Sequence, residues 1–271
     1  MALARVLVPL PDKDFDVTEV AVPWRMLTRR GLDVVFATEK GATPAADPLL
    51  LTGVIFGQLG AEREAKAFYR EMSETPGFES PMAFDDVDPD DFDALLLPGG
   101  HAKGMRQYLE CELLFDKVRA MFDARKQVAA ICHGVIVLAR TKRPDTGRSV
   151  LFDRRTTCLP KYMERTAWMT TRWKLGDYYR TYPEYVEDEV KRVLAHPEQF
   201  VRGPVHLFAK GTADDDSAAF VVDDGPYVSA RWPGDAYKLA RVFGDKVIAR
   251  KTGVPSWRGK AAAPEGSGDT L

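Results

Sequence analysis

Short apolar segments that alternate with helical patterns constrain the fold of this chain more than any other feature. Residues 4–10 are apolar, a helical spacing of apolar residues follows over 17–30, and 32–38 is a second apolar segment. This order predicts strand, helix and strand, with the two strands parallel and joined by a right-handed crossover. Two more apolar segments, 93–98 and 127–132, each run into a glycine-containing turn and a helical pattern. We therefore expect an α/β fold, a three-layer sandwich with a mostly parallel central sheet.

The segment between the second and third predicted strands is long. Residues 39–91 are rich in Pro, Gly and Asp and contain one helical pattern, over 61–72. A structureless loop of that length is unusual in a compact domain, so we interpret the segment as an inserted helical cap over the carboxyl edge of the sheet. Further along the chain the patterns predict a strand over 149–159, a helical region over 177–194, a hairpin over 218–230 and a final helix over 235–250.

The length of the chain fits one large domain. A chain of 271 residues can bury a substantial core, and we expect a single domain over 1–255 that includes the insertion at about 39–91. Residues 256–271 are rich in Ala, Gly, Pro and Ser, which predicts a flexible tail.

The run Ala-Ala-Ile-Cys-His-Gly at 129–134 is the strongest candidate for chemistry. Cys132 follows a predicted buried strand and precedes a helix, a position where helix-terminal N–H groups favour a thiolate over a thiol. We therefore predict that Cys132 is a catalytic thiolate at a tight turn, a nucleophile elbow. His133 is the next residue, and it can act as a base only if the turn is sharp enough to bring its ring toward the substrate.

Other candidate residues are expected at the same edge of the sheet, where ligands bind in open parallel α/β sheets. Glu19, in the first turns of the first helix, would be a carboxyl acid-base partner with a pKa raised by burial. Gly99 and Gly100 permit close backbone approach, and the amides of Gly100 and His133 could stabilise an oxyanion. His101 would bind substrate or cap the following helix.

Each of these residues also has an interpretation without catalysis. A cysteine at a strand end is often an inert core residue, and a carboxylate near a helix N-terminus is stabilised by the helix dipole alone. We interpret Cys111 and Cys158 as structural, and His196, in the sequence His-Pro-Glu, as a residue of a solvated turn. The tyrosines between 178 and 185 are expected to pack an added helix.

Composition excludes several classes of function. A formal net charge of -2 provides no basic footprint for nucleic acid or anionic lipid, so we expect no nucleic-acid partner and no membrane partner. No apolar run is long enough to span a bilayer and the first residues do not form a signal peptide. Three widely spaced cysteines make a disulfide framework unlikely, which favours a cytoplasmic protein. No motif for a metal or a cofactor is present, so we expect neither.

Four segments together resemble the ThiJ/PfpI superfamily, whose flavodoxin-like fold is similar to that of class I glutamine amidotransferases. They are Gly-Leu-Asp-Val at 31–34, Leu-Leu-Pro-Gly-Gly-His at 96–101, Ala-Ile-Cys-His-Gly at 130–134 and Asp-Gly-Pro-Tyr-Val-Ser-Ala-Arg at 224–231. The resemblance covers about residues 4–248. It implies that Cys132 is the elbow nucleophile, that Glu19 is its carboxyl partner in a Glu-x-x-x-Pro motif, and that the protein is a homodimer.

The long insertion and the segment after Cys158 look like the larger members of the superfamily, of the chaperone and glyoxalase III type. The chain departs from the superfamily pattern at Val135, where many members have Pro, and at Cys158, where some have a functional His. No third member of a triad is therefore identified. His133 at the elbow argues against isocyanide hydratase activity, and the lack of a late glutaminase-type His-x-Glu argues against ammonia production from glutamine.

The leading hypothesis is a cofactor-independent cysteine enzyme, a lyase of the glyoxalase III or deglycase kind. Cys132 would add to a small aldehyde such as methylglyoxal, and Glu19 would shuttle protons through an enediol to a hydroxy acid. One alternative is a hydrolase of the PfpI type that cleaves an amide or peptide bond through an acyl-thioester. Another is a chaperone or redox-sensing protein in which Cys132 is oxidised.

Overall fold

A computed structural model describes residues 2–53, 60–205 and 209–253 of the chain. Seven strands form the central sheet in the order β5-β3-β1-β6-β7-β9-β8, and all neighbours are parallel except β8 and β9. The strands are β1 Arg5–Pro9, β3 Asp33–Thr38, β5 Met82–Ala83, β6 Ala94–Leu97, β7 Gln127–Ile131, β8 Val221–Asp224 and β9 Tyr227–Ala230. The expected mostly parallel α/β sheet is confirmed.

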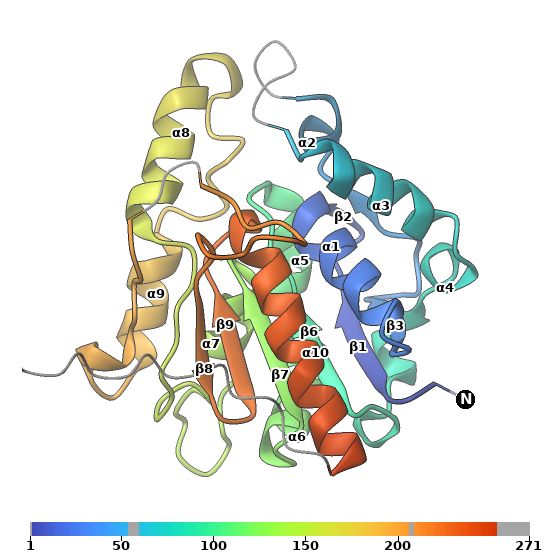
Figure 1. The fold of residues 1–271 in the computed structure, drawn as a ribbon. Helices are drawn as coiled ribbons and strands as arrows, with labels where there is room; N and C mark the ends of the chain where they lie inside the picture. The colour runs from blue at the N-terminus through green and yellow to red at the C-terminus, as the bar shows by residue number, and fades with distance from the viewer. Residues whose placement is uncertain (1, 54–59, 206–208, 254–271) are drawn as a thin grey trace, which may run out of the picture.

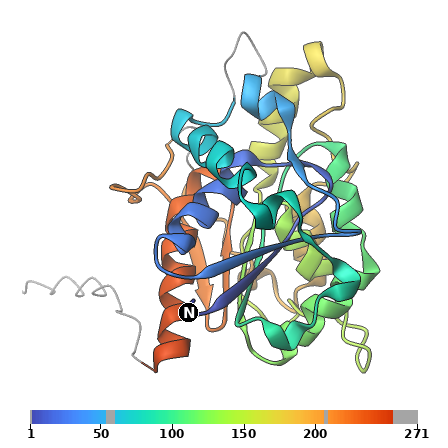
Figure 2. The same ribbon diagram turned by 90° about the vertical axis from the view of Figure 1, so that its right-hand side faces the viewer.

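Helices cover both faces of this sheet (Figure 1). On one face α1 (Val17–Thr28) packs against α10 (Ala236–Thr252), and on the other α6 (Glu112–Asp123) and α7 (Gly134–Arg140) contact β6 and β7. Figure 2, the turned view, shows the sheet between these two layers. Because β1, β6 and β7 are covered on both sides, they are almost entirely apolar, as buried parallel strands require.

The remaining elements gather mainly at the carboxyl ends of the strands and along one edge of the sheet. A small parallel sheet pairs β2 with β4, and the helix α3 of the insertion packs on α1. These elements are β2 Lys13–Phe15, β4 Ala45–Ala46, α2 Pro48–Thr52, α3 Arg63–Ser73, α4 Pro76–Glu79, α5 Arg106–Leu109, α8 Lys161–Leu175 and α9 Val186–Val193. The insertion also supplies β5, which extends the main sheet beside β3, so it is more than a cap.

Two predicted elements differ from the structure. Residues 149–159 form turns with isolated bridges instead of a strand, because side chains rather than a backbone ladder attach this segment to β9: the Thr157 amide donates to Ser229 Oγ at 2.9 Å. The helical region predicted over 177–194 is helical only over α9. Gly176, with φ of 58°, ends α8, and Pro183 disfavours helix at the residue before it.

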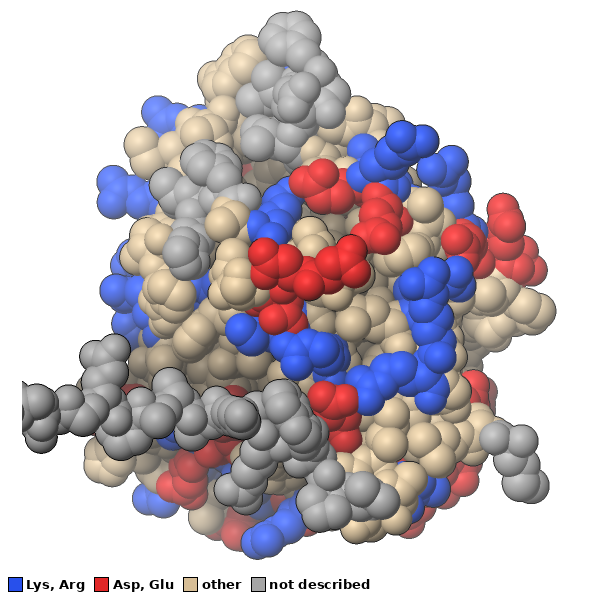
Figure 3. Space-filling model, viewed as in Figure 1, with Lys and Arg blue, Asp and Glu red and all other residues tan. Residues whose placement is uncertain are grey.

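The surface mixes charges of both signs. On the face drawn in Figure 3, lysine and arginine side chains lie among aspartate and glutamate side chains, in accord with the net charge of -2. None of the helices in the described ranges combines the length and the apolar composition that crossing a membrane would need. The predicted tail at 256–271 lies outside the described residues.

Candidate functional site

The elbow forms where β7 meets α7. Cys132 has φ of 58°, in the left-handed region that residues other than glycine rarely adopt. Such conformations cluster at functional sites, where the surrounding structure holds them in place. Gly134 allows the turn to pack against β6, since a Cβ atom there would lie 2.2 Å from the carbonyl oxygen of Leu97. The tight turn predicted at Cys132 is therefore present.

The ring of His133 turns back toward the cysteine. Its Nδ1 lies 3.5 Å from Cys132 Sγ, and its Nε2 lies 3.1 Å from Thr181 Oγ1. The Thr181 hydroxyl donates its one proton to the carbonyl oxygen of His101 at 2.6 Å, so it can only accept from the imidazole. Nε2 therefore carries the proton, and the lone pair of Nδ1 faces the thiol. The turn is therefore sharp enough to bring the His133 ring to the thiol, as a role for His133 as a base requires.

His133 is a neutral base at rest. Burial lowers its pKa well below the usual range, and His101 and Arg140 lower it further. Thr181, which fixes its tautomer, comes from the loop between α8 and α9 and has no sequence signature. The backbone of this loop is held in turn by Arg106, whose Nε donates to the Thr181 carbonyl at 2.7 Å. Thr181 is thus a positioning residue that the sequence did not reveal.

Glu19 is a buried carboxyl that holds a proton. Burial, and then the neighbouring Asp16, raise its pKa well above the usual range, while the Gly99 amide and the nearby Cys132 thiol act in the opposite direction. Glu19 Oε2 accepts from the Gly99 N–H at 2.8 Å. Oε1 is buried and has no hydrogen-bond partner among the described residues. We infer that the proton resides on Oε1.

Asp16 is the N-cap of α1 and orients Glu19. Its Oδ1 accepts from the amides of Thr18 at 2.8 Å and Glu19 at 3.1 Å. Burial raises the pKa of Asp16 to about 6. An aspartate three residues before a glutamate is a helix-start signal, and it could have identified this residue from the sequence.

The surroundings of Cys132 favour a thiol over the thiolate expected from the sequence. Its side chain is fully buried. Burial raises its pKa well above the usual range and the carboxyl of Asp16 raises it further, while the amide of His133 lowers it. The loss of hydration therefore exceeds the effect of the helix terminus. A thiolate forms when the proton passes to Nδ1 of His133.

The two glycines after β6 have different surroundings. A Cβ atom at Gly99 would lie 2.7 Å from the His133 nitrogen, 2.8 Å from Glu19 Oε2 and 2.9 Å from Cys132 Cβ, so only glycine allows these groups to converge. A Cβ atom at Gly100 would instead lie 2.6 Å from the carbonyl oxygen of Asp14, so Gly100 packs against the backbone there. The role of the Gly100 amide in stabilising an oxyanion stays a prediction.

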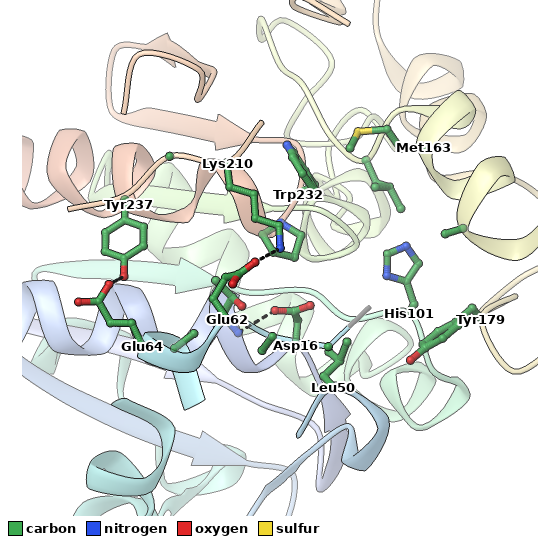
Figure 4. Close-up of a pocket in the computed structure, with 18 of the residues that line it drawn as sticks. Asp16, Leu50, Glu62, Glu64, His101, Met163, Tyr179, Lys210, Trp232 and Tyr237 are labelled. Atoms are coloured by element: carbon green, nitrogen blue, oxygen red, sulfur yellow. Dashed lines mark hydrogen bonds and ion pairs between the residues drawn. The ribbon is translucent and has the colours of Figure 1, made fainter. Parts of the chain in front are cut away.

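His101 joins the thiol to a large cavity. Its ring packs edge-on against that of His133, with centroids 4.9 Å apart, and it lines a cavity of about 910 Å³ (Figure 4). Burial lowers the pKa of His101 to about 4, so the ring is neutral at neutral pH. Its Nε2 is buried and has no partner within the described ranges, which leaves it available to a bound molecule.

Three side chains at the elbow could together hold a metal ion. Ring nitrogens of His101 and His133 and Cys132 Sγ all lie within 4.8 Å of one another, and nitrogen and thiolate donors suit zinc. Both ring nitrogens of His133 already have protein partners, however. A bound metal would displace the thiol proton and compete with transfer of that proton to His133.

The other residues considered from the sequence lie outside the elbow. Cys158 is buried in the core and Cys111 is partly buried. His196 is exposed in a turn, as expected. The tyrosines between 178 and 185 do not belong to a helix. Tyr179 lines the cavity, and the Tyr178 hydroxyl donates to Asp47 Oδ1 at 3.0 Å.

Comparison with known proteins identifies the family and supports the assignment of the fold. The family model described as ThiJ/PfpI family-like matches residues 10–204. A deglycase of Pyrococcus abyssi is 27% identical over 239 residues, 88% of this chain and 96% of that protein. A glutathione-independent glyoxalase of Schizosaccharomyces pombe is 24% identical over 53% of this chain and 59% of that protein. The crystal structure of glyoxalase III from Candida albicans superposes with a TM-score of 0.63 at 20% identity, covering 90% of this chain and 97% of that one.

Proposed function

The chain belongs to the ThiJ/PfpI-like family, and from that premise we propose that it is a cofactor-independent cysteine enzyme of the glyoxalase III or deglycase kind, acting on reactive carbonyl compounds. One observation carries the proposal. A buried thiol lies 3.5 Å from the free ring nitrogen of a neutral histidine, and a carboxyl with a raised pKa lies beside it. The relatives named deglycase and glyoxalase support a reaction of this type.

The first step adds the thiol to an aldehyde. Cys132 Sγ bonds to the carbonyl carbon and its proton passes to Nδ1 of His133. The carbonyl oxygen takes the proton of Glu19, which gives a neutral hemithioacetal and leaves Glu19 ionised.

The remaining steps return the protons. For a 2-oxoaldehyde, ionised Glu19 removes the hydrogen of the hemithioacetal carbon to give an enediol, and then protonates the neighbouring carbon, which leaves a thioester. Water cleaves the thioester to a 2-hydroxy acid: its oxygen bonds to the acyl carbon and one of its protons returns to Glu19. The departing thiolate recovers the proton held by His133, so both catalytic groups regain their resting state. The net reaction adds one water to the 2-oxoaldehyde, with no net oxidation.

Two substitutions test this proposal. Cys132→Ala should abolish the conversion of methylglyoxal to lactate, and Glu19→Gln should lower kcat by about 100-fold or more, as expected for loss of a general acid-base group. Cys158→Ala, which removes a buried thiol far from the elbow in sequence, is the control for folding. Conversion at the wild-type rate by Cys132→Ala would refute the proposal.

The Cys132–His133 pair also suits hydrolysis of an amide through an acyl-thioester, with His133 as the acid for the departing amine. Mass spectrometry after incubation with amide substrates separates the two reactions, since only hydrolysis leaves an acyl group on Cys132 without an aldehyde substrate. The redox alternative has less support, because burial and a raised pKa both slow thiol oxidation.

A further inference from the structure

The cavity beside His101 is large and mostly apolar in lining. Helix α8 contributes Met163, Ala167 and Thr170 to its lining, and other segments contribute Ala61, Ala65 and Trp232. Its volume of about 910 Å³ is near the upper end of the range for drug-sized ligands, roughly 300–1,000 Å³. A small dicarbonyl such as methylglyoxal would leave most of this space unfilled.

Two of the acidic side chains that line the cavity have partners within the protein. Glu62 pairs with Lys210 at 2.6 Å, and Glu64 accepts from the hydroxyl of Tyr237 (Figure 4). These pairs therefore do not require a charged ligand.

Three polar groups of the lining lack partners. His101 Nε2, Trp232 Nε1 and the Tyr179 hydroxyl are buried and have no hydrogen-bond partner in the part of the chain that the structure describes. The indole N–H is a donor only, while the neutral imidazole and the phenol hydroxyl can donate or accept. Because buried polar groups are normally hydrogen-bonded, these groups point to a ligand with a few polar atoms, and the apolar walls point to one with a long hydrocarbon part.

The cavity also adjoins the proposed catalytic groups. His101 lines it and has a ring nitrogen within 4.8 Å of Cys132 Sγ. Asp16, which caps the helix that carries Glu19, lines it as well. A molecule in the cavity that contacts His101 and Asp16 would therefore have one end beside the residues that hold Cys132 and Glu19.

We propose, building on the proposed function, that the substrate is a carbonyl compound with a long apolar tail. Its carbonyl end lies at His101 beside Cys132, and its tail lies along the apolar side chains that α8 and the other lining segments contribute. The reaction at the carbonyl carbon is the one described above, so only the substrate class is extended.

A series of 2-oxoaldehydes of increasing alkyl length tests the proposal. Each methylene that enters the cavity should raise kcat/KM by about fourfold, the effect of burying one such group, until the cavity is full. The same series should bind Cys132→Ala with a Kd that falls with chain length, measured by calorimetry. A kcat/KM and a Kd that both stay constant along the series would refute the proposal.

A pair of variants locates the tail. Ala167→Trp fills the cavity from α8 and should lower kcat/KM for the longest aldehydes at least tenfold more than it lowers kcat/KM for methylglyoxal. Met169→Trp adds the same side chain to the same helix at an exposed position outside the cavity and should change neither. Equal effects of the two variants on long substrates would contradict the proposal.

The proposed function and this inference fail separately. If no 2-oxoaldehyde of any length is converted, the proposed reaction is wrong, and the dependence of Kd on chain length still decides whether the cavity binds apolar tails. If methylglyoxal is converted but longer aldehydes are neither converted faster nor bound more tightly, the reaction stands and the substrate class proposed here is wrong.

Discussion

Thr181 takes the place that an acidic residue often has in catalytic triads. A carboxylate in that place would stabilise a protonated histidine, whereas a hydroxyl that accepts from Nε2 only fixes the tautomer. The Cys132–His133 pair is therefore expected to remain neutral until a substrate arrives, which agrees with the effect of burial on the pKa of both groups.

Replacement of Thr181 tests this positioning role. Thr181→Val removes the acceptor for Nε2–H and should lower kcat/KM about 10-fold to 100-fold, in the range found for residues that orient a functional histidine. Thr181→Ser keeps the hydroxyl and should restore most of the activity. Nitrogen NMR of the His133 ring should show Nε2 protonated in the wild type and a mixture of tautomers in Thr181→Val. A purely structural role would change the melting temperature and leave the tautomer as it is.

The sequence revealed the residues of the site that follow a local pattern. Cys132 stands between an apolar strand and a glycine, and Glu19 stands in the first turn of a helix, so both could be predicted with their positions in the fold. Thr181 could not, because it reaches the site through a loop whose path depends on long-range contacts. The effect of burial on the pKa of Cys132 could not be predicted either, since complete burial is a property of the folded molecule and has no local signature.

At the scale of elements, the N-cap residue of helix α1 stabilises the start of the helix but buries a carboxyl group. Asp16 caps the helix and holds the amide of Glu19, yet its carboxyl is buried. Its pKa is raised from 3.8 to about 6. Between these two pH values the folded protein retains a proton that the unfolded chain releases, so the free energy of unfolding falls as the pH rises through this window and stays lower above it.

The variant Asp16→Asn should remove this penalty. Asparagine caps helices as well as aspartate does and carries no charge to bury. We expect the unfolding free energy of the variant to match the wild type at about pH 4 and to exceed it by up to about 3 kcal/mol at about pH 8, measured by urea denaturation. Asp88→Asn, at an exposed N-cap, is the matched control and should show no such gain. A destabilised Asp16→Asn at the higher pH would contradict the assignment.

Elements were predicted best where their apolar pattern is continuous. The strands β1, β3, β6 and β7 and the helices α1 and α10 each follow such a pattern to within a few residues. Residues 149–159 carry a similar pattern but attach to the core by side-chain bonds such as that from the Thr157 amide to Ser229. Propensity and periodicity do not distinguish these cases, because the difference lies in which partner satisfies the backbone.

At the scale of the whole molecule, the Cys132 thiol is enclosed by segments from different parts of the chain. Its side chain is fully buried, with Gly99 and His133 beside it, so a reagent reaches it only when the surrounding structure opens. The pKa of the thiol is raised by this burial, which further reduces its reactivity, because the thiolate is the nucleophile.

The rate at which each cysteine is alkylated therefore tests whether the Cys132 thiol is enclosed. With iodoacetamide at neutral pH, Cys111, the partly buried thiol, should react first, and Cys132 and Cys158 should react at least tenfold more slowly, as expected for buried thiols. In denaturant all three should react at similar rates, and mass spectrometry of the peptides separates them. A saturating 2-oxoaldehyde should protect Cys132 alone. Rapid alkylation of Cys132 in the folded protein would instead mean that the helix terminus outweighs burial and that the resting cysteine is the thiolate its local sequence predicts.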